Sequence, residues 1–81
     1  MEKSRAYYEK MFFTYPNVVT IVQFCEMLGG IGDGTARKLL RSNKVHHYYI
    51  RTTYHIPKAS IIEYVTSDHY SKYKKKLKVH I

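Results

Sequence analysis

The chain of 81 residues predicts a small α+β domain with the order helix, helix, β-hairpin, helix. Two short stretches with helical spacing of apolar residues begin at Thr20 and near Thr35. A segment rich in aromatic and β-branched residues follows from Val45, and helical spacing returns after Pro57. A chain of this length supports only a small core and leaves little room for an enclosed active site.

The first of these helices is expected from Thr20 to Gly29. Thr20 and Gln23 have the Ser/Thr-x-x-Glu/Gln spacing of a capping box, in which each side chain bonds to the other residue's backbone N–H. Val19 and Phe24 have the spacing of a hydrophobic staple. Gly29 is a typical helix stop.

The second helix is expected from Thr35 to Arg41, with apolar residues on one face and cations on the other. The glycine-rich connection before it, residues 29–34, lacks the preceding strand and the Gly-Lys-Ser/Thr ending of a phosphate-binding loop. We expect it to form the reversal between two packed helices, with Ile31 in the core and Asp33 near the helix N-terminus.

Ser42 and Asn43 can end this helix, since asparagine tolerates the left-handed conformation. Residues 45–50 and 54–56 then predict the two strands of a hairpin, joined by a polar turn at residues 51–53. Pro57 is expected to end the second strand, and residues 58–65 have helical spacing. Residues 1–15 are expected to form an arm or short helix, residues 16–67 the domain, and residues 68–81 a basic tail.

The net charge of +8 is concentrated in two segments. Residues 32–60 contain six basic residues and one acidic residue, which gives +5, and residues 72–81 contain five lysines and no acidic residue, which also gives +5. Clustered cations of this kind suit a phosphate backbone, because each neutralised phosphate releases counterions. A solvated charged surface with a solubilising tail is the alternative interpretation.

Other residue types point away from catalysis and metal binding. Cys25 is the only cysteine and lies at an apolar position of the first helix, so a core role is expected. The five histidines show no pair at a helical ligand spacing, so neither a metal nor any other cofactor is expected. The nine tyrosines are expected mainly in the core and at interfaces, with stacking on unpaired bases as the alternative.

No uninterrupted apolar run is long enough to span a membrane, and no secretory signal is visible. We therefore expect a cytoplasmic, nucleoid-associated location and no membrane partner.

Three motifs in order carry a family resemblance: Leu28-Gly29, Thr35-Ala36-Arg37-Lys38-Leu39-Leu40 and Tyr54-His55-Ile56-Pro57-Lys58. Together they resemble the excisionase-type winged helix-turn-helix domains, relatives of the MerR DNA-binding head, over about fifty residues of the chain. The resemblance implies that residues 32–42 form the recognition helix and residues 48–56 the wing. In helix-turn-helix proteins the recognition helix enters the major groove of DNA.

The resemblance also implies a set of DNA-binding residues. On the recognition helix they are Thr35, Arg37, Lys38 and Arg41, and around the wing they are Arg51, Thr53, His55 and Lys58. The lysine tail is expected to form an arm on DNA, with Lys72, Lys74, Lys75 and Lys76 as its contacts. The tail's alternatives are a patch for anionic membranes and a contact for a protein partner.

Members of this family perform no bond chemistry. They bind neighbouring sites on double-stranded DNA, often as cooperative copies, and bend it so that a tyrosine recombinase is biased towards excision of a phage or integrative element. The resemblance thus implies duplex DNA, a tyrosine recombinase and further copies of the chain as partners. A transcriptional regulator with the same fold and a module that binds an acidic protein are the alternatives.

Overall fold

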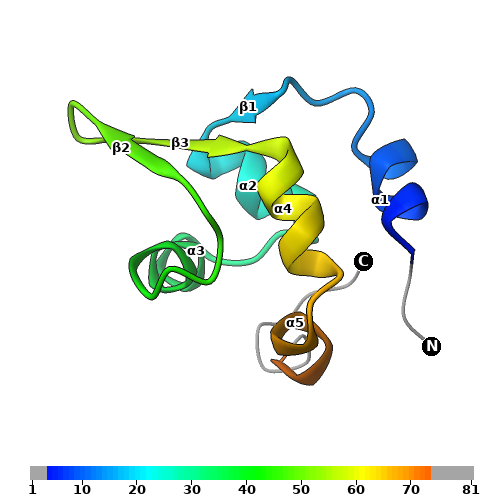
Figure 1. Cartoon of the computed structure of the whole chain (residues 1–81). Coiled ribbons are helices and arrows are strands. Elements are labelled where there is room, and N and C mark those ends of the chain that lie inside the picture. The colour runs from blue at the N-terminus through cyan, green and yellow to red at the C-terminus, as the bar shows by residue number, and fades with distance from the viewer. Residues whose placement is uncertain (1–3, 74–81) are drawn as a thin grey trace.

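The computed structural model describes residues 4–73, which contain five helices and a three-stranded antiparallel sheet (Figure 1). The elements are α1 (Arg5–Met11), β1 (Val18–Val19), α2 (Ile21–Met27), α3 (Asp33–Arg41), β2 (Tyr48–Ile50), β3 (Thr53–Pro57), α4 (Lys58–Val65) and α5 (Asp68–Tyr73). The expected α+β class and the order helix, helix, hairpin, helix are confirmed in α2, α3, β2–β3 and α4.

The start of α2 is fixed by the capping box that the sequence predicts. The Thr20 hydroxyl accepts a hydrogen bond from the Gln23 backbone N–H at 3.2 Å, and the Thr20 N–H donates to the Gln23 side-chain oxygen at 3.0 Å. Val19 and Phe24 are both buried, as a hydrophobic staple requires. After the helix, Gly29 and Gly30 have φ of 82° and 86°, which lets the chain reverse towards α3.

Helix α3 begins at Asp33, two residues earlier than the apolar spacing indicates. Gly32 is its N-cap, and the Asp33 carboxylate lies in the first turn, where the helix dipole favours negative charge. At the other end the Ser42 hydroxyl donates to the Lys38 carbonyl at 2.7 Å, and Asn43 has a left-handed φ of 58°. Both residues therefore end the helix as predicted.

The sheet has the strand order β1-β3-β2, so β3 is the central strand. Val18 and Val19 pair with Pro57 and Ile56, while β2 and β3 form the expected hairpin. The turn of this hairpin has two residues rather than the expected three, because Thr53 already pairs with Ile50. Arg51 and Thr52 form the turn with φ of 50° and 63°.

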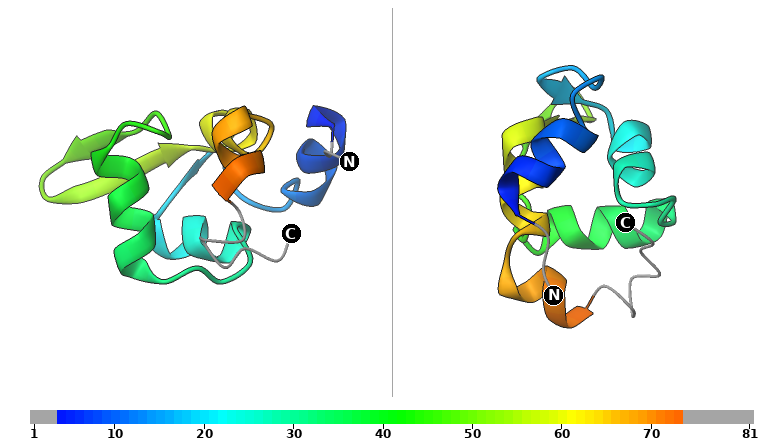
Figure 2. Two further views of the ribbon diagram at one scale, coloured as in Figure 1. Left: turned by 90° about the horizontal axis from the view of Figure 1, so that it is seen from below. Right: turned by 90° about the vertical axis from the view of Figure 1, so that its right-hand side faces the viewer.

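The core lies between the sheet and the helices that pack against it. Helices α2 and α4 pack on β3, α3 packs on α2, and α1 packs on α4. Tyr8 of α1 and the following Phe12 are both buried. A view from below shows the hairpin and α3 at one end of the molecule and α1 at the other (Figure 2, left). The hairpin projects from the core above α3 (Figure 1).

The segment expected to open the basic tail forms helix α5 instead of an extended arm in its described part. Tyr70 of this helix is buried, and its ring packs edge-on against Tyr64 of α4 at 5.7 Å between centroids. The Tyr64 hydroxyl and the His69 Nδ1 atom are 2.9 Å apart and share a hydrogen bond. An apolar anchor therefore holds residues 68–73 on the domain, whereas residues 74–81 lie outside the described part of the chain.

Within residues 4–73, none of the helices is both long and apolar enough to cross a membrane.

Candidate nucleic-acid interface

Helix α3 presents three different surfaces. Its inner face buries Ala36, Leu39 and Leu40 in the core. Gly34, Lys38 and Arg41 lie on the opposite face of the helix, because they follow one another at spacings of four and three residues. We call these three positions the outer line of α3. Lys38 and Arg41 are exposed, and neither side chain has a hydrogen bond or ion pair within the described residues.

Arg37 lies on the flank of α3 that faces the hairpin, and two neighbours hold it. Its Nε–H donates to the Asp33 carboxylate at 2.7 Å, and its guanidinium carbon is 5.8 Å from the centroid of the Tyr54 ring. The hydrogen bond to Asp33 raises the pKa of the Arg37 guanidinium, and the Asp33 charge adds to this. Arg37 is therefore cationic but already partnered, which differs from the freely exposed cation expected from the sequence.

The hairpin turns aromatic residues towards α3. Tyr49 and Tyr54 are cross-strand partners with ring centroids 4.8 Å apart, and the His47 ring lies 5.5 Å from that of Tyr54. The His47 Nδ1 atom is 2.9 Å from the Val45 carbonyl, which holds the ring in place. We call His47, Tyr49 and Tyr54 the aromatic wall, because they form the side of the hairpin next to Arg37.

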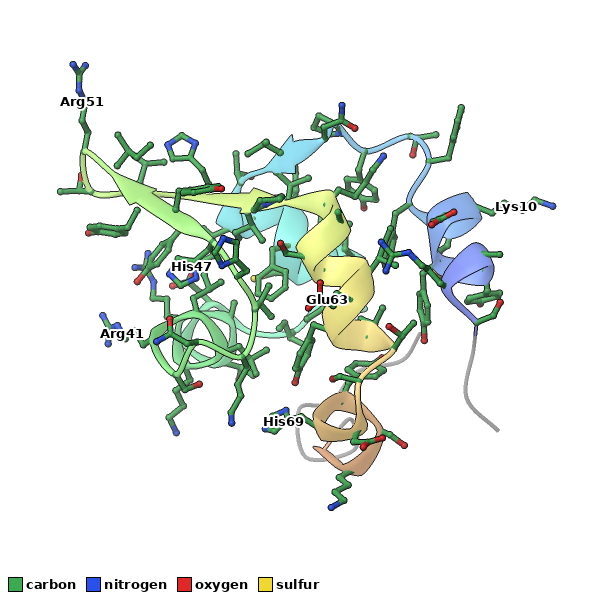
Figure 3. The ribbon with its side chains drawn as sticks, in the orientation of Figure 1. Lys10, Arg41, His47, Arg51, Glu63 and His69 are labelled. Atoms are coloured by element: carbon green, nitrogen blue, oxygen red, sulfur yellow. The ribbon has the colours of Figure 1, made fainter. Side chains whose placement is uncertain are left out.

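The other cations at this end of the molecule point outward. Figure 3 shows Arg51 projecting from the hairpin tip and Arg41 projecting from α3 on the same side of the molecule. Lys10 projects from α1 on the opposite side (Figure 3). The fold therefore places the α3 cations and Arg51 at one end, although 13 positions separate Lys38 from Arg51 in the sequence.

The other residues expected to contact DNA are not grouped with Arg41 and Arg51 in the described part of the chain. Thr53 and His55 alternate with Tyr54 along β3, so they lie on the hairpin face turned away from α3. Thr35 is half-buried on the flank of α3 away from Arg37. Lys72 is exposed on α5, and Lys74, Lys75 and Lys76 lie outside the described residues.

Lys58 also has a local role in the structure. Its ammonium donates to the Tyr15 carbonyl at 2.9 Å, and its backbone N–H donates to the Asn17 carbonyl at 2.7 Å. Both bonds connect α4 to the segment before β1, at the opposite end of β3 from the hairpin tip (Figure 1). Lys58 thus ties two segments together and is not grouped with Arg41 and Arg51.

Sequence reasoning did not identify the residues that hold Arg37. It placed Asp33 only near the helix N-terminus, although the spacing of four residues between Asp33 and Arg37 is a usable signal for an ion pair. The role of Tyr54 had no such signal, because it comes from a different element. Tyr48, Tyr49 and Ile50 are also more than half exposed. Tyrosines were expected mainly in the core and at interfaces, and these two tyrosines lie outside the core.

Three other features were candidates for a reactive or ligand-binding site: the cysteine, a small pocket and the metal-binding residue types. Cys25 is half-buried against the core, and burial raises the pKa of its thiol, which disfavours the reactive thiolate. A pocket of about 100 Å³ lies between the α3–β2 connection and α4, lined by Lys44, His46, Ser60, Glu63, Tyr64 and Ser67. Across residues 4–73, no group of three His, Cys, Asp or Glu side chains is placed to hold a metal ion.

A scan against protein-family models, a search of curated proteins and a search of solved structures find no match to this chain. The fold and the site together define a small α+β protein that presents a cationic helix beside an aromatic hairpin with a cationic tip.

Proposed function

We propose that this protein binds double-stranded DNA as a winged helix-turn-helix, with α3 in the major groove and the β2–β3 hairpin as the wing. The observation that carries the proposal is the position of Lys38 and Arg41 on the outer line of α3, where neither has a partner among residues 4–73. Arg41 lies on the same side of the molecule as Arg51 at the hairpin tip (Figure 3). An α-helix fits the major groove, and a second cationic element beside it can follow the phosphate backbone.

The charge balance of this end of the molecule supports the same proposal. Asp33 is the only acidic residue in residues 32–60, and its carboxylate is already bonded to Arg37. The approach of a polyanion therefore meets one compensated negative charge and several uncompensated cations. Neutralisation of each phosphate by Lys or Arg releases condensed counterions, which is the main source of affinity in such complexes.

The finer proposal is an architectural role as an excisionase, a recombination directionality factor that acts with a tyrosine recombinase of a phage or integrative element. It is supported by the sequence resemblance around Leu28-Gly29, the α3 motif and the hairpin exit at Tyr54-His55-Ile56-Pro57-Lys58. Bending a DNA site costs a few kcal/mol, and contacts along the bent path must offset it. A chain of 81 residues would achieve this with several copies bound side by side.

The test of DNA binding compares two double variants that remove the same charge. Lys38→Ala/Arg41→Ala removes the cations of the outer line, and Arg5→Ala/Lys10→Ala removes two cations from α1 at the opposite end. Affinity for a labelled random duplex is measured by fluorescence anisotropy at several salt concentrations. We expect the α3 variant to bind more weakly and its log–log salt slope to fall by about 2, because each neutralised phosphate contributes about 0.9 to the slope.

The α1 variant should retain the affinity and salt slope of the wild type. Equal losses in both variants would mean that net charge alone governs binding and would contradict the placement of α3 in the groove. Failure of the wild type to bind any duplex at low salt would refute the proposed function itself.

The excisionase role is tested by footprinting on attachment-site DNA with and without the recombinase. We expect adjacent protected segments with enhanced cleavage between them, as bent DNA gives, and stronger protection when the recombinase is present. Protection confined to a promoter, unchanged by the recombinase, would support a transcriptional regulator instead.

A further inference from the structure

Two contacts hold the side chain of Arg37 in place, although they contribute little to the stability of the fold. The Asp33–Arg37 pair is surface-exposed, with side-chain exposures of 61% and 43%, and exposed ion pairs one helical turn apart stabilise proteins only weakly. Tyr54 adds a second constraint from the hairpin, since its ring lies 5.8 Å from the guanidinium carbon. Two neighbours from two different elements thus fix one arginine beside the outer line of α3.

The contact with Asp33 uses only the Nε atom of Arg37, so the two terminal Nη nitrogens remain available to bind a base. Asp33 accepts from Nε–H, and no other hydrogen bond to the Arg37 side chain is present within residues 4–73. The two Nη nitrogens therefore keep their N–H donors. In a planar guanidinium these are the donors that can form two parallel hydrogen bonds to the O6 and N7 acceptors of guanine.

We propose that Asp33 and Tyr54 are positioning residues that hold Arg37 ready to read one guanine in the major groove. This inference rests on the proposed function, because it assumes that α3 enters the groove. A free arginine loses rotamer freedom when it binds a base, whereas an arginine that is already oriented loses less of it. The wrong base then leaves the oriented donors unpaired, so orientation increases discrimination more than affinity.

The negative charge of Asp33 makes the proposal distinguishable from a purely structural role, because its removal should change affinity and base preference in opposite directions. The exposed carboxylate lies in the first turn of α3, beside the cations that are proposed to attract the phosphates, so its removal should strengthen binding to DNA of any sequence. Removal should at the same time weaken the preference for guanine. A residue that acts only through helix stability would change both quantities in the same direction.

The experiment is selection of bound sequences from a random duplex pool by the full-length protein, followed by affinity measurements on the selected duplex and on random DNA. The variants are Asp33→Ala, Tyr54→Ala and Arg37→Lys, which keeps the charge but loses the planar fork. Glu63→Ala is the matched control, because it removes one exposed carboxylate from α4, away from α3 (Figure 3). Circular dichroism verifies that each variant is folded.

We expect the wild type to select a guanine at one position of the site, and Arg37→Lys to lose that selection. Asp33→Ala should bind random DNA more tightly, yet its discrimination for that guanine should fall about tenfold. Tyr54→Ala should also lose discrimination, and Glu63→Ala should keep it.

An equally sharp guanine preference in Asp33→Ala would overturn the inference while leaving DNA binding intact. Loss of a cytosine preference in Asp33→Ala would also overturn the inference, since a carboxylate can itself accept a hydrogen bond from the cytosine amino group. A wild type that binds duplex DNA but selects no Arg37-dependent guanine would also overturn it. A wild type that binds no duplex would refute the proposed function first, so the two failures are distinguishable.

Discussion

Arg37 and Lys38 are adjacent in sequence, yet the fold gives them different environments. Lys38 extends from the outer line of α3 without a partner in the described part of the chain, whereas Arg37 is bonded to Asp33 and faces Tyr54. A step of about 100° around the helix separates them, and only one of the two directions meets the hairpin. In the proposed complex the two cations therefore have different tasks, phosphate attraction for Lys38 and base reading for Arg37.

Tyr64 shows how burial gives a single residue a measurable pH dependence. Burial raises its pKa to about 12 from an ordinary value of 10.0. Between these values the unfolded chain loses the phenolic proton while the folded chain keeps it, so stability must fall as the pH rises from 10 towards 12. At pH values below this range the contribution is fully present.

We expect Tyr64→Phe to lose less stability than the wild type over this range, because phenylalanine cannot ionise. The difference should grow to about 2 kcal/mol at the upper end of the range, measured by urea unfolding at a series of pH values. Tyr48→Phe, at an exposed position of the hairpin, is the control and should follow the wild type. A difference between Tyr64→Phe and wild type that stays constant with pH would contradict the assignment.

Among the secondary-structure elements, the β2–β3 hairpin departs most from local preference. Its turn residues, Arg51 and Thr52, both have left-handed backbones, the geometry of a two-residue turn that normally contains Asn-Gly. A β-branched threonine at φ 63° is strained, since its side chain crowds the backbone. The turn therefore stores strain next to Arg51, which the proposed DNA contact needs at the tip.

Replacement of Thr52 by glycine should relieve this strain. We expect Thr52→Gly to raise the free energy of unfolding by about 0.5–1 kcal/mol, since relief of strain exceeds the added entropy of the unfolded chain. Thermal unfolding followed by circular dichroism measures the change. Thr53→Gly, one residue later in regular β3, should instead destabilise the protein, and equal losses in both variants would show that Thr52 is unstrained.

At the scale of the whole molecule, positive charge is divided between the end formed by α3 and the hairpin and the C-terminal segment. Helix α5 is anchored by buried Tyr70, so a truncation after Tyr73 keeps this anchor and every residue from 4 to 73. The segment removed, residues 74–81, contains four lysines, Lys74, Lys75, Lys76 and Lys78. This division allows the general and the sequence-specific parts of the proposed DNA binding to be measured separately.

We expect truncation after Tyr73 to weaken binding to selected and random duplexes equally. The log–log salt slope should fall by up to about 4, because each lysine that neutralises a phosphate contributes about 0.9. A full-length variant with Leu77, Val79 and Ile81 replaced by serine keeps the lysines and should keep the slope. A truncation that changes discrimination between the duplexes would instead give the segment a role in base reading.

The sequence by itself determined the features that depend on neighbours within about one helical turn. The capping box of Thr20 and Gln23, the reversal at Gly29 and the end of α3 at Asn43 all lie where the spacing predicted them. Each is a local hydrogen bond or a backbone preference, so the residues that form it are close together in the chain. The element order of the α+β domain followed from these signals and from the hydrophobic spacing.

Only the tertiary structure decided which side chains share a surface. It placed Tyr54 beside Arg37 and turned Thr53 and His55 to the other hairpin face. It also committed the Lys58 ammonium to the Tyr15 carbonyl, 43 positions away. Contacts of this kind depend on how the elements pack, because chain reversals bring distant residues together in ways that residue spacing does not encode.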